Sequence, residues 1–453
     1  MWNRPRVLIA APASGSGKTM ITCGILQALV LRGLNVASFK CGPDYIDPMF
    51  HEKVIGARSG NLDLFFADAP NLRRLFVRNS AAADVSVIEG VMGYYDGMLA
   101  ASDDASSYTV SRTLDCPTVL IVNARGQSVS ALATLEGFAR FRADSGVKGV
   151  IFNQMPERIF HALKPQVEAM GIAALGYVPK AEDMVIESRH LGLVTPDEIR
   201  DLSERLKRLA ALLEQTVDLD ALLALARSAP ELDAPPEPEY PALPATKIAV
   251  ARDEAFCFLY RDNLALLERL GAELCFFSPI HDGALPDGAQ GLILCGGYPE
   301  LYAQALSENT AMLAAVRDAV NGGMPTLAEC GGFMYLHGEM EDMSGTLWPM
   351  AGVIPGKVWR TKKLGRFGYI TLSANADTPF LPVGETVRAH EFHYYESENC
   401  GGALTAVKPD GVRNWTCEHA EGGLLAGFPH LFYESNPQLI VRFLRRCAGK
   451  GDT

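Results

Sequence analysis

Continuous apolar runs alternate with amphipathic segments along the first half of the chain. The apolar runs are RVLIAAPA, NVASFK, VSVIEG, TVLIVNA, VKGVIFNQ and AALGYVP, and a helical pattern, KTMITCGILQALVLRG, follows the first of them. Unbroken apolar runs are typical of strands that are covered on both faces. They predict an α/β fold built on a doubly wound parallel sheet.

The second half begins the same alternation again. It opens with KIAVARDEA, continues through the helical pattern LYRDNLALLERLG and the runs ELCFFSP, GLILCGG and TLAEC, and then adds GYITL and TVRAHEFHYY. The later runs are rich in β-branched and aromatic residues. This pattern predicts a second doubly wound sheet with strand-rich insertions.

A proline-rich stretch at 229–246 separates the two halves. It carries six prolines and four acidic residues. Proline lacks an amide donor and acidic side chains resist burial, so we expect an extended linker here. The predicted domains are therefore 1–228 and 247–453, a division that suits a chain of 453 residues.

Composition excludes several classes of partner. Hydrophobic residues make up 48% and charged residues 21%, as in an ordinary globular enzyme. No apolar run approaches the roughly 20 residues of a membrane span, so we expect a cytoplasmic protein without a membrane partner. A net charge of −12 disfavours nucleic acid. The ten cysteines form no C-x-x-C pair, and we expect most of them to be small buried hydrophobic residues.

The stretch APASGSGKT at 11–19 lies between the first predicted strand and the first predicted helix. This is the setting of a phosphate-binding loop, although Pro12 replaces the first glycine of the strict pattern. Glycines let backbone amides turn toward phosphate, a lysine neutralises the outer phosphates, and a threonine hydroxyl holds Mg²⁺. The alternative is a glycine-rich turn that only caps a helix. The expected ATP-binding residues are Ser14, Gly15, Ser16, Gly17, Lys18 and Thr19.

Acidic residues follow two of the predicted strands. Glu89 ends VSVIEG, where the metal-binding acid of an ATPase stands, and the segment FKCGPDYIDPMFH follows the second strand. The alternatives are a helix cap for Glu89 and an ordinary turn for the acids of the second segment. We expect Mg²⁺ to be held by Thr19, Asp47 and Glu89, and the substrate to be contacted by Asp44, Tyr45 and Asp96.

The stretch TLAECGGFMYL places Cys330 between a short apolar strand and a helix. Such a sharp turn exposes a nucleophile, and the backbone amide that follows it can stabilise an oxyanion. Gly331 would supply that amide, and Gly297, in GLILCGGYPELY, would supply a second.

A cysteine nucleophile also needs a base. The chain offers His430 in LLAGFPHLFYESNP, and His390 and His393 in RAHEFHYYE. His430 follows a short apolar run, so we expect it at a strand end facing the same cleft as Cys330.

Taken together, these motifs resemble the family of cobyrinic acid a,c-diamide synthases over nearly the whole chain. The resemblance is carried by APASGSGKT, FKCGPDYIDPMFH, EGVMGYYDG, GGYPELY, AECGGFMYL and HEFHYYE. It implies a dethiobiotin-synthetase-like P-loop ATP domain joined to a class I glutamine amidotransferase domain with a flavodoxin-like sheet. It also implies amidation of the a and c acetate side chains of cobyrinic acid, a corrinoid, with ATP, Mg²⁺ and glutamine.

The resemblance leaves alternatives open. Common class I amidotransferases have a glutamate two residues after the catalytic histidine, whereas this chain has Phe432, which favours a Cys330–His430 dyad. Relatives of the family act on hydrogenobyrinic acid or nickel-sirohydrochlorin. A different class remains open too: a partitioning-type P-loop ATPase with a regulatory amidotransferase-like domain. A homodimer is one expected state, and the basic segment at 357–366 and the pair Arg189 and His190 are further candidates for contacts with substrate carboxylates.

Overall fold

The computed structural model describes residues 1–180 and 196–449, so Arg189 and His190 lie outside the described residues. The chain divides into two compact units, Met1–Glu237 and Pro238–Thr453. The stretch 229–246 contains no helix, and its first part is held on the first unit: Trp2 and Leu232 exchange two backbone hydrogen bonds of 2.9 Å each. The border between the units therefore falls inside the stretch that we expected to be a linker.

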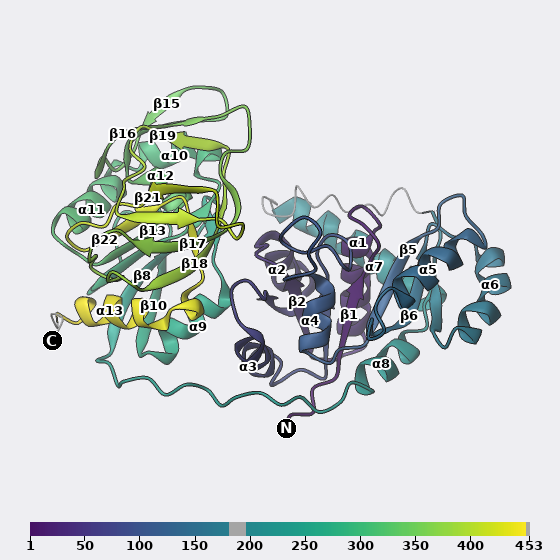
Figure 1. Ribbon diagram of the computed structural model, residues 1–453. Helices are drawn as coiled ribbons and strands as arrows, with labels where there is room; N and C mark the ends of the chain where they lie inside the picture. The colour runs from purple at the N-terminus through teal and green to yellow at the C-terminus, as the bar shows by residue number, and fades with distance from the viewer. Residues whose placement is uncertain (181–195, 450–453) are drawn as a thin grey trace. The chain divides into compact units, whose positions relative to one another are not determined.

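The first unit is built on a seven-stranded sheet in which every strand pair is parallel (Figure 1). Its strand order is β3 (Arg58–Leu62), β2 (Val36–Cys41), β4 (Val85–Glu89), β1 (Arg6–Ala10), β5 (Thr118–Asn123), β6 (Val147–Asn153) and β7 (Ala173–Val178). Strand β3, with the sequence RSGNL, is one that the hydrophobic pattern did not predict.

Helices cover both faces of this sheet. The consecutive β1 residues Val7, Leu8 and Ile9 are all fully buried, which explains the unbroken apolar run. One face packs against α1, α7 and α8 in a shared core. The helical elements are α1 (Lys18–Leu31), α2 (Ile46–Phe50), the π-helical turn η1 (His51–Ile55), α3 (Ala69–Asn79), α4 (Ser107–Thr113), α5 (Ser130–Arg140), α6 (Glu157–Ala169), α7 (Pro196–Thr216) and α8 (Leu219–Arg227).

The second unit contains a parallel sheet of five strands. Its order is β10 (Ala272–Phe277), β8 (Thr246–Ala251), β11 (Gly291–Leu294), β13 (Thr326–Glu329) and β22 (Leu424–Gly427). Counted along the chain this order is 2-1-3-4-5, the flavodoxin-like arrangement. The two doubly wound domains that the sequence predicts are thus confirmed.

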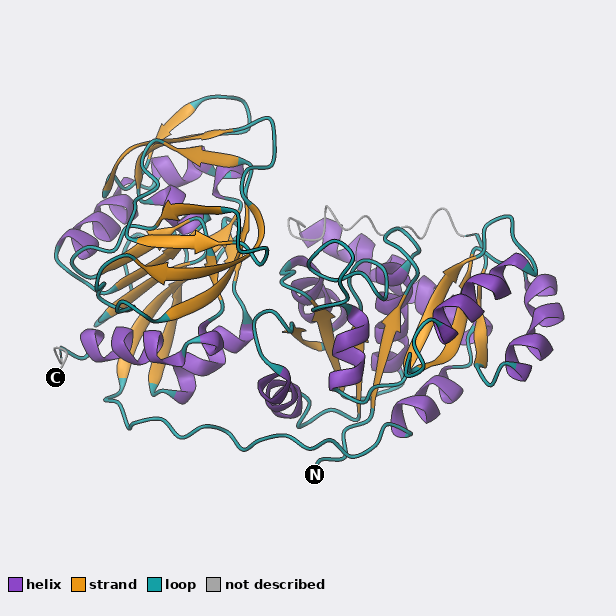
Figure 2. Cartoon of the chain, viewed as in Figure 1, coloured by secondary structure: helices purple, strands orange, loops and turns teal. Residues whose placement is uncertain are grey.

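Three smaller sheets make the second unit strand-rich (Figure 2). They are β12 (Gly296–Gly297) with β9 (Phe256–Phe258); β15 (Leu347–Pro349), β14 (His337–Glu341), β16 (Ile354–Arg360) and β19 (Tyr395–Ser397); and β21 (Asn414–Cys417), β20 (Leu404–Val407), β17 (Phe367–Ala374), β18 (Thr386–Phe392) and β23 (His430–Leu431). The last of these sheets shares a core with one face of the parallel sheet, where Leu372 and Val387 meet Ile293.

Helices of the second unit complete its two cores. α10 and α11 pack on one face of the parallel sheet, and α9 and α13 pack on the other. The helical elements are α9 (Arg261–Arg269), η4 (Pro299–Leu301), α10 (Ala303–Glu308), α11 (Thr310–Asn321), α12 (Gly331–Tyr335), η5 (Tyr433–Ser435) and α13 (Pro437–Cys447).

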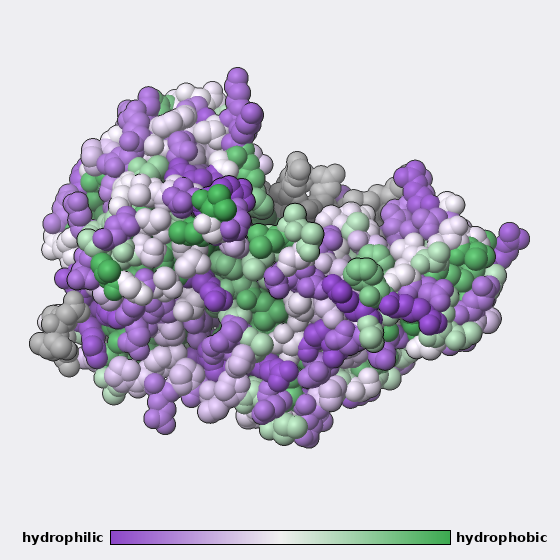
Figure 3. All heavy atoms as spheres, in the orientation of Figure 1, coloured by the Kyte–Doolittle hydropathy of each residue, from purple (hydrophilic) through white to green (hydrophobic). Residues whose placement is uncertain are grey.

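The surface is mixed in character. The face shown in Figure 3 carries hydrophilic residues over most of its area, with smaller apolar areas between them. Among the described residues, no helix combines the length and the apolar character needed to cross a bilayer. Seven of the ten cysteines are buried, as the sequence predicts.

Candidate active sites

The loop between β1 and α1 requires glycine at two positions. Gly15 and Gly17 have φ values of 77° and 94°, in the left-handed region that favours glycine. A Cβ atom on Gly17 would lie 2.3 Å from Nδ2 of Asn153, whose amide donates to the carbonyl of Ser16 at 2.9 Å. The hydroxyl of Ser16 closes the turn by donating to Ala13 O at 2.8 Å. These contacts fix the shape of the loop.

Lys18 begins α1 and is buried beside this loop. Its ammonium group donates to the carbonyl oxygens of Met92 at 2.5 Å and of Ala13 at 3.4 Å. Burial and the neighbouring Lys40 ammonium lower the pKa of Lys18 to about 8, against the opposing effect of Glu89. Near neutral pH the group remains largely protonated, which suits contact with phosphate oxygens.

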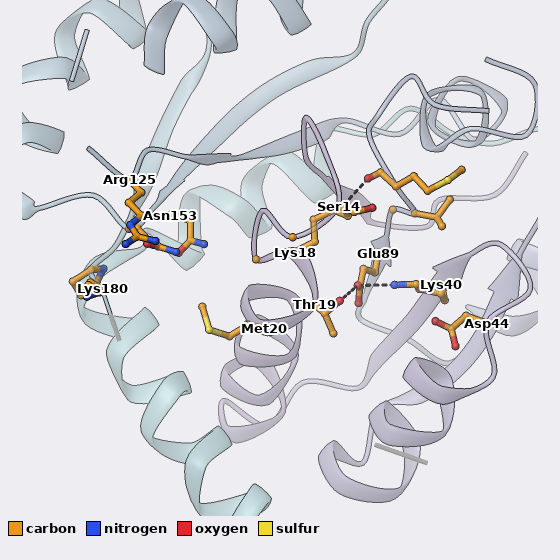
Figure 4. Close-up of a pocket in the computed structure, with 17 residues that line it drawn as sticks. Ser14, Lys18, Thr19, Met20, Lys40, Asp44, Glu89, Arg125, Asn153 and Lys180 are labelled. Atoms are coloured by element: carbon orange, nitrogen blue, oxygen red, sulfur yellow. Dashed lines mark hydrogen bonds and ion pairs between the residues drawn. The ribbon is translucent and has the colours of Figure 1, made fainter. Parts of the chain in front are cut away.

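Thr19, Lys40 and Glu89 converge at the carboxyl ends of β2 and β4 (Figure 4). Sheet register brings them together, because Lys40 is the direct partner of Glu89 on the neighbouring parallel strand. Oε1 of Glu89 accepts from the Thr19 hydroxyl and from the Lys40 ammonium, both at 2.7 Å. The sequence analysis singled out Thr19 and Glu89 but missed Lys40; the signal was a charged residue inside a buried strand.

The segment after β2 holds the remaining acids of this site. The Asp47 carboxylate lies 2.5 Å from Nζ of Lys40, its side chain is 4% exposed, and it is not among the residues that line the cavity. Burial tends to raise the pKa of Asp47, but the Lys40 ammonium outweighs it and lowers that pKa. Asp44 lines the cavity, and burial and the Asp47 charge raise its pKa. Tyr45, which the sequence analysis expected to contact the substrate, is 9% exposed.

A cavity of about 620 Å³ lies at the mouth of the phosphate loop. Lys18, Thr19 and Glu89 are among the residues that line it. Four cationic side chains and two acidic ones line it, which suits a polyanionic ligand despite the net charge of −12. Asp96 is exposed and is not among the lining residues; its carboxylate accepts from the amide of Gly93 at 3.0 Å. Lining residues that the sequence analysis did not single out include Lys40, Arg125, Asn153, Gln154 and Lys180.

Cys330 occupies a strained turn between β13 and α12. Its φ of 48° and ψ of −102° are unusual for a residue with a side chain, and its amide donates to Gly427 O at 2.7 Å. The side chain is almost completely buried, at 6% exposure. This is the sharp strand-to-helix turn that the sequence predicts, held at the carboxyl edge of the parallel sheet.

Gly297 and Gly331 lie next to each other at this turn. A Cβ atom on Gly331 would lie 3.2 Å from the backbone nitrogen of Gly297 and 2.9 Å from Cδ of Pro299. A Cβ atom on Gly297 would lie 2.0 Å from Ala255 O. Neither position accommodates a side chain, and the two glycines lie together at the turn that carries Cys330.

His430 begins β23, three residues after the end of β22. Its ring lies against Gly296, where a Cβ atom would be 2.3 Å from Cε1, so the imidazole reaches the same strand ends as Cys330. Burial, with the neighbouring His390 and His393, lowers the pKa of His430 to about 3. Burial and the carboxylates of Glu300 and Glu391 raise the pKa of the Cys330 thiol. At neutral pH Cys330 is therefore a thiol and His430 a neutral imidazole.

The other two histidines have different surroundings. Both ring nitrogens of His393 are engaged, one with Oε1 of Glu391 at 2.7 Å and the other with Tyr395 O at 2.5 Å. His390 is the register partner of His430 across β18 and β23, and its ring lies on Phe367. Two residues after His430, where the glutamate of a Cys–His–Glu triad would stand, the chain has the buried Phe432.

We expect His430→Ala to lower glutaminase activity by about 10²–10⁴-fold, the usual contribution of a general base. His390→Ala and His393→Ala should keep a rate of the same order as the native one. Both ring nitrogens of His393 are hydrogen-bonded, to Glu391 and to Tyr395, so His393 is not free to act as the base. Glutamate release from glutamine measures all three variants. A near-native rate for His430→Ala with loss in either of the others would reverse the assignment.

Each unit also matches a known domain family. The model of the CobQ/CobB/MinD/ParA nucleotide binding domain matches residues 7–193, and that of the CobB/CobQ-like glutamine amidotransferase domain matches residues 247–437. The protein is thus of the class that joins a nucleotide-binding P-loop domain to a glutamine amidotransferase domain.

Relatives over the full length narrow the class to one family. The chain is 38% identical over 450 residues to the cobyrinate a,c-diamide synthase of Caldanaerobacter subterraneus subsp. tengcongensis, covering 98% of each chain. It is 40% identical over 445 residues to that of Salmonella typhimurium, covering 96% of this chain and 97% of the relative. For Gloeobacter violaceus the identity is 41% over 443 residues, with 97% and 96% covered. The chain belongs to the cobyrinate a,c-diamide synthase family.

Proposed function

We propose that this chain converts cobyrinate into its a,c-diamide, using ATP and glutamine, in cobalamin biosynthesis. The observation that carries the proposal is the presence of two complete constellations on one chain: a phosphate loop with Thr19 on Glu89, and a cysteine in a strained turn beside two glycine amides. Relatives of nearly the same length bear the name of this reaction. A ligase of this kind needs both constellations.

The first unit would activate the carboxylate. A carboxylate oxygen of the corrinoid attacks the γ-phosphorus of ATP, which gives an acyl phosphate and ADP. Ammonia then displaces phosphate and leaves an amide. Lys18 would contact the outer phosphate oxygens, and the loop amides around Gly15 and Gly17 would bind the inner ones. Asp44 lies in the same cavity wall, where the acetate side chain must approach.

The residues present fit Mg²⁺. A P-loop site holds this ion through a hydroxyl, a carboxylate and phosphate oxygens, and the Thr19 hydroxyl and Glu89 carboxylate already lie together. Bound there, Mg²⁺ would neutralise the charge that develops on the transferred phosphoryl group.

The second unit would release the ammonia. Sγ of Cys330 attacks the side-chain amide carbon of glutamine, while His430 takes the thiol proton and passes it to the leaving ammonia. The backbone amides of Gly297 and Gly331 would stabilise the tetrahedral oxyanion. Water then hydrolyses the thioester to glutamate and frees the thiol.

The proposal extends to the setting of the enzyme. We propose that the enzyme is a homodimer in the cytoplasm. It would act on free corrinoid, without a nucleic acid or membrane partner. The acidic net charge of −12 supports the exclusion of nucleic acid. Sedimentation velocity of the purified chain tests the dimer directly.

We expect Asp47→Asn to lower the rate of amidation roughly 10²-fold or more, with either glutamine or ammonium as nitrogen source. The change removes the charge that faces Lys40 and keeps the size of the side chain. Basal glutaminase, which belongs to the other unit, should be unchanged and reports that the variant is folded. Full diamide synthesis by this variant would exclude a role of the Asp47 charge in amidation.

A further inference from the structure

Lys40 is the centre of a buried cluster of charges. Its ammonium nitrogen lies 2.5 Å from Oδ2 of Asp47 and 2.7 Å from Oε1 of Glu89. The side chains of Lys40, Asp47 and Glu89 are 8%, 4% and 0% exposed. Figure 4 shows Lys40 approaching Glu89 from the side opposite Thr19. One cation therefore lies between two buried acids, of which Glu89 lines the cavity.

The carboxylates depend on this lysine. Two buried anions repel each other strongly, and an isolated buried charge is costly, so the pair needs a cation between them. Burial works to lower the pKa of Lys40, but Glu89 and Asp47 outweigh it and raise that pKa. The two carboxylates that flank the lysine stabilise its charged form.

We propose that Lys40 is a positioning residue that acts as a built-in cation: it holds Glu89 and Asp47 in place and prevents a divalent ion from binding at Glu89 until nucleotide arrives. The inference rests on the proposed Mg²⁺ site. It adds an order of binding, metal with nucleotide and not before it.

The physical reason is charge balance at a single oxygen. A divalent ion held by Thr19 and Glu89 would lie close to the Lys40 ammonium, because Thr19 and Lys40 bond the same oxygen of Glu89. The phosphates of ATP bring the negative charge that offsets this repulsion. Metal and nucleotide then favour each other's binding, and the coupling is reciprocal.

Thermal unfolding in the presence of Mg²⁺ alone tests this role without measuring catalysis. The wild-type melting temperature should not change with Mg²⁺ alone and should rise with Mg²⁺ plus a non-hydrolysable ATP analogue. In Lys40→Met, Mg²⁺ alone should raise the melting temperature, at concentrations at least about tenfold below any at which wild type responds.

Three further variants define the site of the effect. Lys40→Arg keeps the charge and should behave as wild type. Lys53→Met removes an exposed lysine nearby in the sequence and makes the same change in net charge, so it should also behave as wild type. Adding Glu89→Gln to Lys40→Met should remove the response to Mg²⁺ alone.

Two outcomes overturn the role of Lys40: a cooperatively melting Lys40→Met that ignores Mg²⁺ alone, or a wild-type protein that binds Mg²⁺ equally well with and without nucleotide. The second measurement stands even if the methionine variant fails to fold. No stabilisation of wild type by nucleotide with Mg²⁺ would instead contradict the ATP site itself, and the inference with it.

Discussion

Cys330→Ala is expected to lower the rate of amidation from glutamine roughly 10³-fold or more. Amidation from ammonium salts should stay near the native rate. The sulfur is the group that opens the glutamine amide, whereas free ammonia enters the reaction after that step. The strained backbone at Cys330 is fixed by its neighbours and not by the sulfur, because its amide is bound to Gly427 O. Mass spectrometry of the corrinoid with each nitrogen source measures the effect.

Cys447→Ala is the matched control. This cysteine is also 6% exposed, but it lies at the end of α13, with its sulfur packed against Gly291. Its loss should lower stability by about 1 kcal/mol or somewhat more and leave both nitrogen sources usable. Equal loss of both activities in Cys330→Ala would assign that residue a structural role.

Lys18→Met is expected to lower amidation about 10²–10³-fold with glutamine and with ammonium alike. The ammonium group is buried at the loop and lines the cavity, where it would contact the outer phosphates of ATP. Glutaminase without ATP should be unaffected, because Cys330 and His430 belong to the other unit.

Lys53→Met serves as control here as well, since it makes the same change in charge at an exposed position. It should retain both activities. A Lys18→Met enzyme that still forms diamide from ammonium at the native rate would remove phosphate contact by this lysine from the mechanism.

The sequence predicts the central strands because burial on both faces leaves a clear mark. Val7, Leu8 and Ile9 are consecutive and fully buried, so the run itself is the signal. Strand β3 carries no such mark: its sequence RSGNL has one large apolar residue, and it lies at the sheet edge beside β2. Its backbone pairing, which the side-chain pattern does not encode, makes it a strand.

Lys40 shows why part of the site stayed hidden. The phosphate loop and the turn at Cys330 are local, so a few consecutive residues define them. Lys40 acquires its partners through sheet register with Glu89 and through the helical turn that carries Asp47. Pairings between distant segments depend on the strand order, and the sequence alone did not provide it.

The central claim is that one polypeptide links glutamine hydrolysis to ATP-dependent amidation of a corrinoid. The direct measurement is mass spectrometry of cobyrinate incubated with the purified chain, ATP, Mg²⁺ and glutamine labelled with heavy nitrogen in its side-chain amide, with hydrogenobyrinate and nickel-sirohydrochlorin in parallel. The account predicts that cobyrinate gains two labelled amides, each dependent on ATP. Unchanged cobyrinate, or labelled amides formed only on another tetrapyrrole, would contradict it.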